Sequence, residues 1–144
     1  MEVSVQDSAA VLITRLSRQI YRRIDAAEIG MDMKAVLTLG HLREHGGTAP
    51  QSTLAAFLCL DANMLVLVLN ELEAAGHVVR RRDPADRRRH IVELTAEGRA
   101  ARDAVDDYIA SIEDEILGAM DPAHRRRLRA LLAEALDSTF STLA

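Results

Sequence analysis

The sequence contains little of several residue types, and each shortage excludes a class of protein. Its single cysteine, Cys59, cannot form a disulfide within the chain, which agrees with a reducing compartment. Seven glycines and three prolines in 144 residues, with 49% hydrophobic residues, exclude a disordered or fibrous chain. No apolar run approaches the roughly 18 residues of a membrane span, and the N-terminus lacks the pattern of a signal peptide. We therefore expect one compact, mostly helical domain in the cytoplasm.

Motifs for catalysis are missing as well. The chain has no Gly-rich phosphate loop, Ser-His-Asp set or pair of carboxylates typical of a catalytic cleft, so we do not expect an enzyme or a cofactor. His41 and His45 have the spacing that places two imidazoles on one helix face, but no cysteine or third histidine is near in sequence. We expect no metal site there. Cys59 stands between two leucines, which favours a buried, inert thiol over a redox sensor.

Apolar residues at helical spacing predict two helices in the first third of the chain. Leu12, Leu16, Ile20 and Ile24 recur every four residues, which predicts an amphipathic helix over residues 7 to about 27. A second helix is predicted from residue 33 to about 45, where two glycines end it.

Two short helices follow, separated by a tight turn. Thr48, with Gln51 three residues later and a proline between them, predicts a capped helix through residue 58. Asp61 is expected to cap the next helix, which Gly76 ends. The inward face of that helix is predicted to consist of four apolar residues, namely Leu65, Val68, Leu69 and Leu72. Together the two helices predict a helix-turn-helix.

The periodicity changes after Gly76. Residues 77–82 and 89–94 have the alternation and β-branched residues of strands, and the turn DPAD between them predicts a hairpin. Thr95 is expected to cap one long helix to about Met120, and Asp121 with its following proline opens a last one. This last helix carries an apolar stripe made of Leu128, Leu131, Leu132, Leu136 and Phe140.

Positive charge is concentrated on the hairpin. Between residues 80 and 89 six arginines stand against two aspartates, a local excess of +4 in a chain of net charge -4, so the remainder carries about -8. Arginine suits phosphate oxygens and narrow minor grooves, so this segregation favours a nucleic-acid contact. The alternative is a solvated hairpin shaped by a pair between Asp86 and Arg88.

The order of these predicted elements is similar to that of the MarR family of winged-helix transcription regulators. The stretch ELEAAGHVVRRRDPADRRRHIVELTAEGR resembles the recognition-helix end and wing of that family. The most specific matches are the Asp-x-Arg of the wing, at Asp86 and Arg88, and the Leu-Thr-x-x-Gly at Leu94, Thr95 and Gly98. The resemblance implies a mostly α winged helix-turn-helix with a two-stranded wing, plus N- and C-terminal dimerisation helices.

The resemblance also implies partners and an organisation of the chain. Residues 7–30 and 96–144 would form the dimerisation helices of a homodimer, and residues 33–94 the DNA-binding winged helix-turn-helix. Two such lobes would meet one double-stranded operator with an inverted repeat, and a small-molecule effector would change their spacing. The peroxide-sensing branch carries its cysteine in the N-terminal helix, which has none here, so we do not expect that mechanism.

The predicted recognition helix departs from the family pattern, which has Ser, Thr and Arg on the outward face. Here no basic residue lies on it. Asn63 has the chemistry to pair with an adenine edge, Asn70 to reach a base or a phosphate, and Leu67 to touch a thymine methyl. The full set of predicted DNA contacts comprises Gln51, Ser52, Asn63, Met64, Leu67, Asn70, Arg82, Arg87, Arg88 and Arg89, with Asp86 stabilising the wing.

Two hypotheses of function follow from this departure. The first is a sequence-specific DNA-binding transcriptional regulator, a ligand-responsive repressor that acts as a homodimer and relies on its wing. The second is an interaction protein that keeps the scaffold, has lost DNA binding and holds a protein partner through the apolar helix. Salt-dependent binding to duplex DNA separates them, because neutralising phosphates releases counterions.

Overall fold

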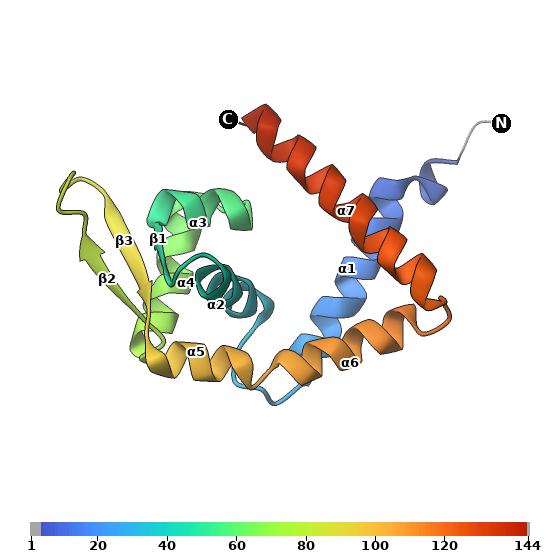
Figure 1. The fold of residues 1–144 in the computed structure, drawn as a ribbon, viewed down its shortest axis with the longest axis horizontal. Coiled ribbons are helices and arrows are strands. Elements are labelled where there is room, and N and C mark those ends of the chain that lie inside the picture. Colours follow the sequence, from blue (N-terminus) through green and yellow to red (C-terminus); the bar gives the residue numbers. More distant parts are fainter. Residues whose placement is uncertain (1–3, 144) are drawn as a thin grey trace. The chain divides into compact units, whose positions relative to one another are not determined.

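The chain folds into helices and one small sheet. The computed structural model describes residues 4–143, without the side chains from Phe140 onward. The chain divides after Tyr108 into two compact units. In chain order the elements are η1 (Val5–Asp7), α1 (Ala9–Ala26), α2 (Met33–Glu44), β1 (Thr48–Pro50), α3 (Gln51–Leu58), α4 (Ala62–Ala74), β2 (Val78–Arg82), β3 (His90–Leu94), α5 (Ala96–Asp103), α6 (Asp106–Leu117) and α7 (Pro122–Leu143), as Figure 1 shows.

Side-chain caps set the start of several helices in the first unit. The carboxylate of Asp61 accepts from the Met64 amide at 2.8 Å, and the Thr95 hydroxyl accepts from the Gly98 amide at 2.9 Å. Both predicted caps are therefore confirmed. The first helix begins at Ala9 rather than at residue 7, because the hydroxyl of Ser8 provides its cap.

The segment before α3 is a strand, so the predicted cap at Thr48 is wrong. Thr48, Ala49 and Pro50 form β1, and α3 begins at Gln51 without a side-chain cap. The strand forms because Ala49 is buried and lies opposite Val92 in β3. A long-range backbone pairing thus overrides a local capping pattern.

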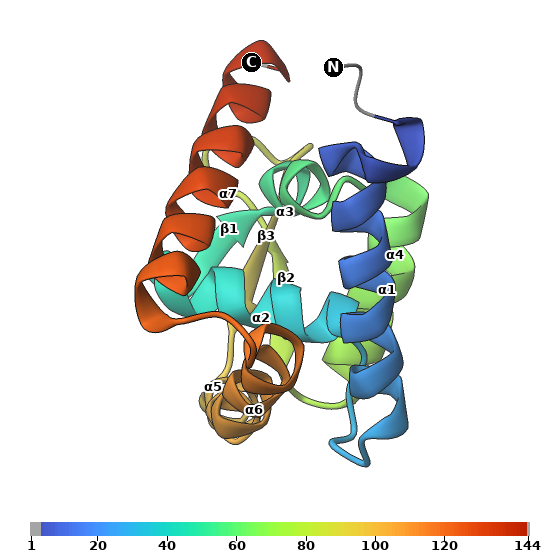
Figure 2. The ribbon, with the colours of Figure 1, turned by 90° about the vertical axis from the view of Figure 1, so that its right-hand side faces the viewer.

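The three strands form one antiparallel sheet in the order β1, β3, β2. Strand β3 is central, so Val92 lies opposite both Ala49 of β1 and Arg80 of β2. The β2–β3 hairpin is the predicted two-stranded wing, and in Figure 1 its turn extends beyond the end of the paired strands. In the view of Figure 2, α2 lies in front of the sheet.

A core of apolar side chains joins the sheet to the helices of the first unit. The predicted inward face of α4 is buried, as expected. The least exposed apolar side chains come from α1 to α4 and both wing strands, and they include Ile24, Leu39, Leu42, Leu54, Leu65, Leu69, Val78 and Val92. The mostly α winged helix-turn-helix fold predicted from the sequence is therefore confirmed.

The predicted helix from Thr95 to about Met120 is interrupted, so that prediction is wrong in this respect. The structure has α5 to Asp103 and α6 from Asp106, with a turn at Ala104 and Val105. The turn lets the side chain of Val105 become buried. The local sequence contains no glycine or proline that would predict the end of a helix there.

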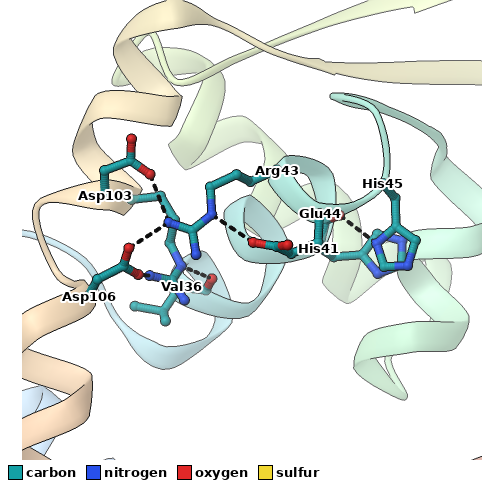
Figure 3. Close-up of polar contacts among 8 residues, drawn as sticks. Val36, His41, Arg43, Glu44, His45, Asp103 and Asp106 are labelled. Carbon is teal, nitrogen blue, oxygen red and sulfur yellow. Dashed lines mark hydrogen bonds and ion pairs between the residues drawn. The ribbon is translucent and has the colours of Figure 1, made fainter.

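Two arginines connect this interruption to α2, and Figure 3 shows one of them, Arg43, between Asp103 and Asp106. Arg102 donates from Nε to the main-chain oxygen of Val36 at 3.1 Å and forms an ion pair with Asp106 at 2.6 Å. Arg43 of α2 pairs with Asp103 at 2.7 Å and with the same Asp106 at 2.9 Å. Arg43 above all, and Arg102 as well, hold the pKa of the Asp106 carboxyl below its ordinary value. The turn between α5 and α6 is therefore held by a network of charges.

The apolar stripes predicted at the two ends of the chain are largely exposed. On α1 the side chain of Ile24 is buried, whereas Leu12 and Leu16 are exposed. On α7 Leu131, Leu132 and Leu136 are exposed, while the side chain of Phe140 lies outside the described residues.

Within residues 4–143 no single helix is long and apolar enough to cross a membrane; α3 and α4 pass such a test only as a pair, and they are bent by 107°.

The start of α5 packs directly on the base of β2. Thr95 donates from its hydroxyl to the Gly76 oxygen at 2.7 Å, and its amide donates to the His77 oxygen. Gly98 is buried in this contact, where a Cβ atom would lie 2.0 Å from the His77 oxygen. Only glycine allows the helix to approach so closely.

We predict that Gly98→Ala lowers the free energy of unfolding by about 3 kcal/mol, the upper end of the cost of overpacking, because the contact is with rigid backbone. Gly40→Ala is the matched control, since its Cβ atom would meet only the Arg102 side chain, at 3.1 Å. Urea titration of both variants measures the difference. Equal stability of Gly98→Ala and the parent would contradict this packing.

Candidate nucleic-acid interface

Helix α4 presents an exposed face that is a mixture of amides and apolar groups. Its exposed residues include Asn63, Met64, Leu67 and Asn70, and 57% of the surface of Leu67 is exposed to solvent. These four are the residues of α4 that the sequence analysis predicts as DNA contacts. The face carries no positive charge of its own, so any attraction to phosphate must come from neighbouring elements.

The turn between α3 and α4 exposes Cys59, so the predicted burial of its thiol is wrong. Cys59 ends α3 in the left-handed conformation, with a φ of 54°. Leu58 and Leu60, on either side, pack against the core. Because the chain reverses at Cys59, its neighbours turn inward while its own side chain faces solvent.

Two aspartates organise the tip of the wing. The side chain of Asp83 accepts from the Ala85 amide at 2.9 Å. The side chain of Asp86 accepts from both the amide and Nε of Arg88, at 3.1 and 3.2 Å. Arg88 holds the pKa of the Asp86 carboxyl below its ordinary value, with a smaller contribution from Arg89. The Asp86 side chain therefore ties Arg88 to the turn.

The six arginines of the wing are not equivalent. Arg80 pairs with Glu73 of α4 at 3.1 Å, and Arg81 pairs with Glu93 of β3 at 3.6 Å. Arg82 donates to the main-chain oxygen of Arg87 at 2.9 Å. These contacts partly neutralise the first two arginines and fix the third.

The arginines nearest the turn remain available to a ligand. Arg88 pairs with Asp86 yet keeps 92% of its side chain exposed. Within the described part of the chain, the side chains of Arg87 and Arg89 donate no hydrogen bond. The tip therefore carries most of the positive charge of the wing that the protein itself does not neutralise.

Helices α3 and α4 and the wing meet around two open hollows. One, of about 250 Å³, is lined by residues from all three, namely Gln51, Ser52, Ala55, Ala62, Leu65, Arg88, Arg89 and His90. The other, of about 380 Å³, brings Gln51 and Val66 beside Arg82 and His90. The structure thus brings together Gln51, Ser52, Arg82, Arg88 and Arg89 from the predicted set.

His90 lines both hollows and was missed from the sequence. Its only sequence signal is its place directly after Arg89, at the start of β3. Asn63, Met64, Leu67 and Asn70 do not line the 250 Å³ hollow and lie along the exposed face of α4.

His41 and His45 contact each other rather than standing open as a pair of ligands (Figure 3). Their rings stack with centroids 4.1 Å apart. The ring of His41 also lies against that of Phe57, with centroids 4.4 Å apart. Nδ1 of His45 lies 2.8 Å from the His41 main-chain oxygen. Burial lowers the pKa of His41, and the nearby His45 lowers it further. Within residues 4–143 no group of three or more His, Cys, Asp or Glu side chains has the arrangement of a metal site.

This arrangement defines the class of protein as a winged helix-turn-helix, and comparison with known proteins identifies the family. The model of the MarR family matches residues 32–90, which span α2 to the start of β3. By this matched region and by its fold, the chain belongs to the MarR family.

Relatives and solved structures agree with this family. The HTH-type transcriptional repressor NicR of Pseudomonas putida is 32% identical over 102 residues, which are 71% of this chain and 64% of that protein. The chain spans about half to two thirds of the length of the curated relatives it matches. A MarR-family regulator from Rhodococcus sp. RHA1 has the same fold, with a TM-score of 0.83 and 24% identity over 91% of this chain and 94% of that one. CouR from Rhodococcus jostii RHA1, solved with p-coumaroyl-CoA, has a TM-score of 0.76 and 25% identity over 91% and 93%.

We predict that Asp86→Ala loosens the wing tip alone. The Arg88 amide loses its acceptor, so its hydrogen exchange should accelerate roughly fivefold, as for the loss of one exposed hydrogen bond. Asp83→Ala is the matched control, because it frees the Ala85 amide instead. Exchange measured by NMR, amide by amide, checks this. The prediction fails if the Arg88 amide exchanges at the parent rate.

Proposed function

We propose that this protein is a sequence-specific, double-stranded-DNA-binding transcriptional regulator that acts as a homodimer. The observation that carries the proposal is the 250 Å³ hollow, where the start of α3, the start of α4 and the wing arginines face one space. A recognition helix with a flanking basic hairpin is the arrangement that places side chains in a major groove and beside its phosphates. A chromosomal target also agrees with the cytoplasmic location expected from the sequence.

The two parts of this surface would have different tasks. Arg87, Arg88 and Arg89 project from the wing tip and suit phosphate oxygens of any sequence. Gln51 and Ser52 stand at the start of α3, where main-chain amides also favour anions. On α4, Asn63 is exposed and has the two groups that an adenine edge requires.

The exposed apolar residues of α1 and α7 support the homodimer. In α7 the side chains of Leu131, Leu132 and Leu136 are exposed together, and α1 exposes Leu12 and Leu16. Patches of this kind are covered in a stable protein, and a second copy of the chain supplies matching ones. Two equal lobes would prefer an inverted repeat with half-sites about 10 base pairs apart.

We further propose that the protein is a repressor that responds to a small molecule. The relative in Pseudomonas putida is named a repressor, and CouR was solved with p-coumaroyl-CoA. In this chain a hollow of about 420 Å³ lies between α1, α2 and α4, within the range of small-molecule sites. Its rim includes Asp25, Asp32 and Glu71, so a neutral or cationic molecule would suit it better than an anion.

A second candidate function is the interaction protein that has lost DNA binding. The observation in its favour is the apolar exposure of α4 at Met64 and Leu67. Such a protein would bind its partner without regard to phosphate charge, so its binding would depend little on salt.

We predict that Arg87→Ala weakens binding to operator and to scrambled duplex alike. The slope of log affinity against log salt should fall by about one unit, since one phosphate contact is lost. Asn63→Ala should leave this slope unchanged and reduce the ratio of specific to nonspecific affinity, by roughly tenfold for one bidentate base contact. Fluorescence anisotropy over a salt series, on duplexes selected by the parent, measures both.

Arg126→Ala, an exposed arginine of α7, is the matched control for the loss of one positive charge. This variant should change neither the salt slope nor the ratio of specific to nonspecific affinity. If the parent shows no salt-dependent binding to any duplex, the interaction protein becomes the better account. If the Arg87 variant keeps the parent slope, Arg87 does not contact phosphate.

We predict that the parent sediments as a dimer at micromolar concentration and that Leu132→Asp abolishes both dimerisation and DNA binding. An unpaired carboxylate in an apolar interface has no compensating partner. Ala130→Asp adds the same charge on the opposite side of α7 and should leave the dimer intact. A folded parent monomer in analytical ultracentrifugation would contradict this.

A further inference from the structure

Arg80 of the wing forms hydrogen bonds with two side chains of the recognition helix. Its guanidinium donates from Nη2 to Oδ1 of Asn70 at 2.7 Å. Glu73, one turn further along α4, accepts from Arg80 at Nε, at Nη2 and at the main-chain amide, over 3.1 to 3.4 Å. The side chain of Arg80 is 21% exposed. Arg80 is therefore held in place and does not project into solvent as Arg88 does.

The strand register explains why Arg80 reaches α4. Alternate residues of a strand point to opposite faces, so Arg80 lies on the same face as the buried Val78. That face packs on α4. Arg81, one residue further, lies on the other face and pairs with Glu93. The contact with Asn70 is thus a consequence of the fold and does not require DNA.

The chemistry of the contact fixes which way the Asn70 amide points. A guanidinium has only donors, so the atom of Asn70 that faces it must be the oxygen. The amide nitrogen, with its two hydrogens, then faces away from Arg80. Asn63 makes no such contact among the described residues, so its amide remains able to turn either way.

We propose that Arg80 is a positioning residue that makes Asn70 a hydrogen-bond donor to DNA. The inference rests on the proposed DNA-binding function. An asparagine that pairs with adenine must accept from N6 and donate to N7 at once, which needs both amide atoms toward the base. With its oxygen turned to Arg80, Asn70 has only donors to offer. It therefore suits the acceptors of guanine, N7 and O6, or thymine O4, whereas Asn63 suits adenine.

The same contact separates Arg80 from the other wing arginines. Its charge is matched by Glu73, and the Arg80 guanidinium lowers the pKa of the Glu73 carboxyl. Arg80 should therefore add little to phosphate neutralisation, so its loss should change base preference and leave the salt slope as in the parent. An arginine that contacts phosphate would behave in the opposite way.

The experiment selects duplexes from a random library with the parent, Asn70→Ala, Arg80→Leu and Arg80→Lys. Positions read by Asn70 are those whose preference disappears in Asn70→Ala. At these positions the parent should select guanine or thymine. Arg80→Leu should shift the selection toward adenine by about tenfold, the discrimination of one bidentate contact. Arg80→Lys should keep the parent preference, because an ammonium is also a donor only.

Side-chain amide relaxation in the free parent tests the contact without DNA. The amide of Asn70 should be rigid on the nanosecond timescale and that of Asn63 mobile. Equal mobility of the two overturns the inference, as does a parent that selects adenine at the Asn70 positions. An Arg80→Leu variant that is folded by circular dichroism and keeps the parent preference also overturns it. Failure of the parent to enrich any duplex would instead refute the proposed function, and the base readout with it.

Discussion

The pairing of β3 with both of its neighbours is the constraint on which the proposed interface depends. Val92 lies opposite Ala49 on one side and Arg80 on the other. Because β1 runs directly into α3, the central strand β3 fixes the position of the start of α3 relative to the wing. A shift of one residue in this register would turn Arg80 away from α4 and expose Val78. The burial of Val78 therefore specifies where the polar contacts of the interface form.

The placement of charge follows from this strand pairing. The arginines near the base of the wing are used within the protein, Arg80 with Glu73 and Arg81 with Glu93. The arginines at the tip remain exposed, and Asp86 orders the turn that carries them. An acidic chain can thus present a basic edge, because Arg87, Arg88 and Arg89 are exposed and only Arg88 among them forms an ion pair within the described residues. This division is the physical basis for separating sequence-independent affinity in the wing from base selection on α4.

Sequence patterns predicted the elements whose causes are local. The caps at Asp61 and Thr95 and the inward face of α4 are confirmed, because capping and periodicity act over a few residues. Strand β1 and the turn at Val105 were missed, since each depends on a partner far along the chain. Cys59 is exposed because it adopts a left-handed conformation, and the sequence has no glycine at this position that would predict one. The contact from Arg80 to Asn70 likewise requires the strand register.

Hydrogen–deuterium exchange of the protein, with and without a duplex that it selects, tests the central claim most directly. If α3, α4 and the wing form one DNA-binding surface, amides around Gln51, Asn63 and Arg87 should be protected together on the duplex. Protection should grow weaker in all three segments as salt rises. Protection confined to α4, or unchanged exchange at the wing tip in the presence of saturating duplex, would contradict it.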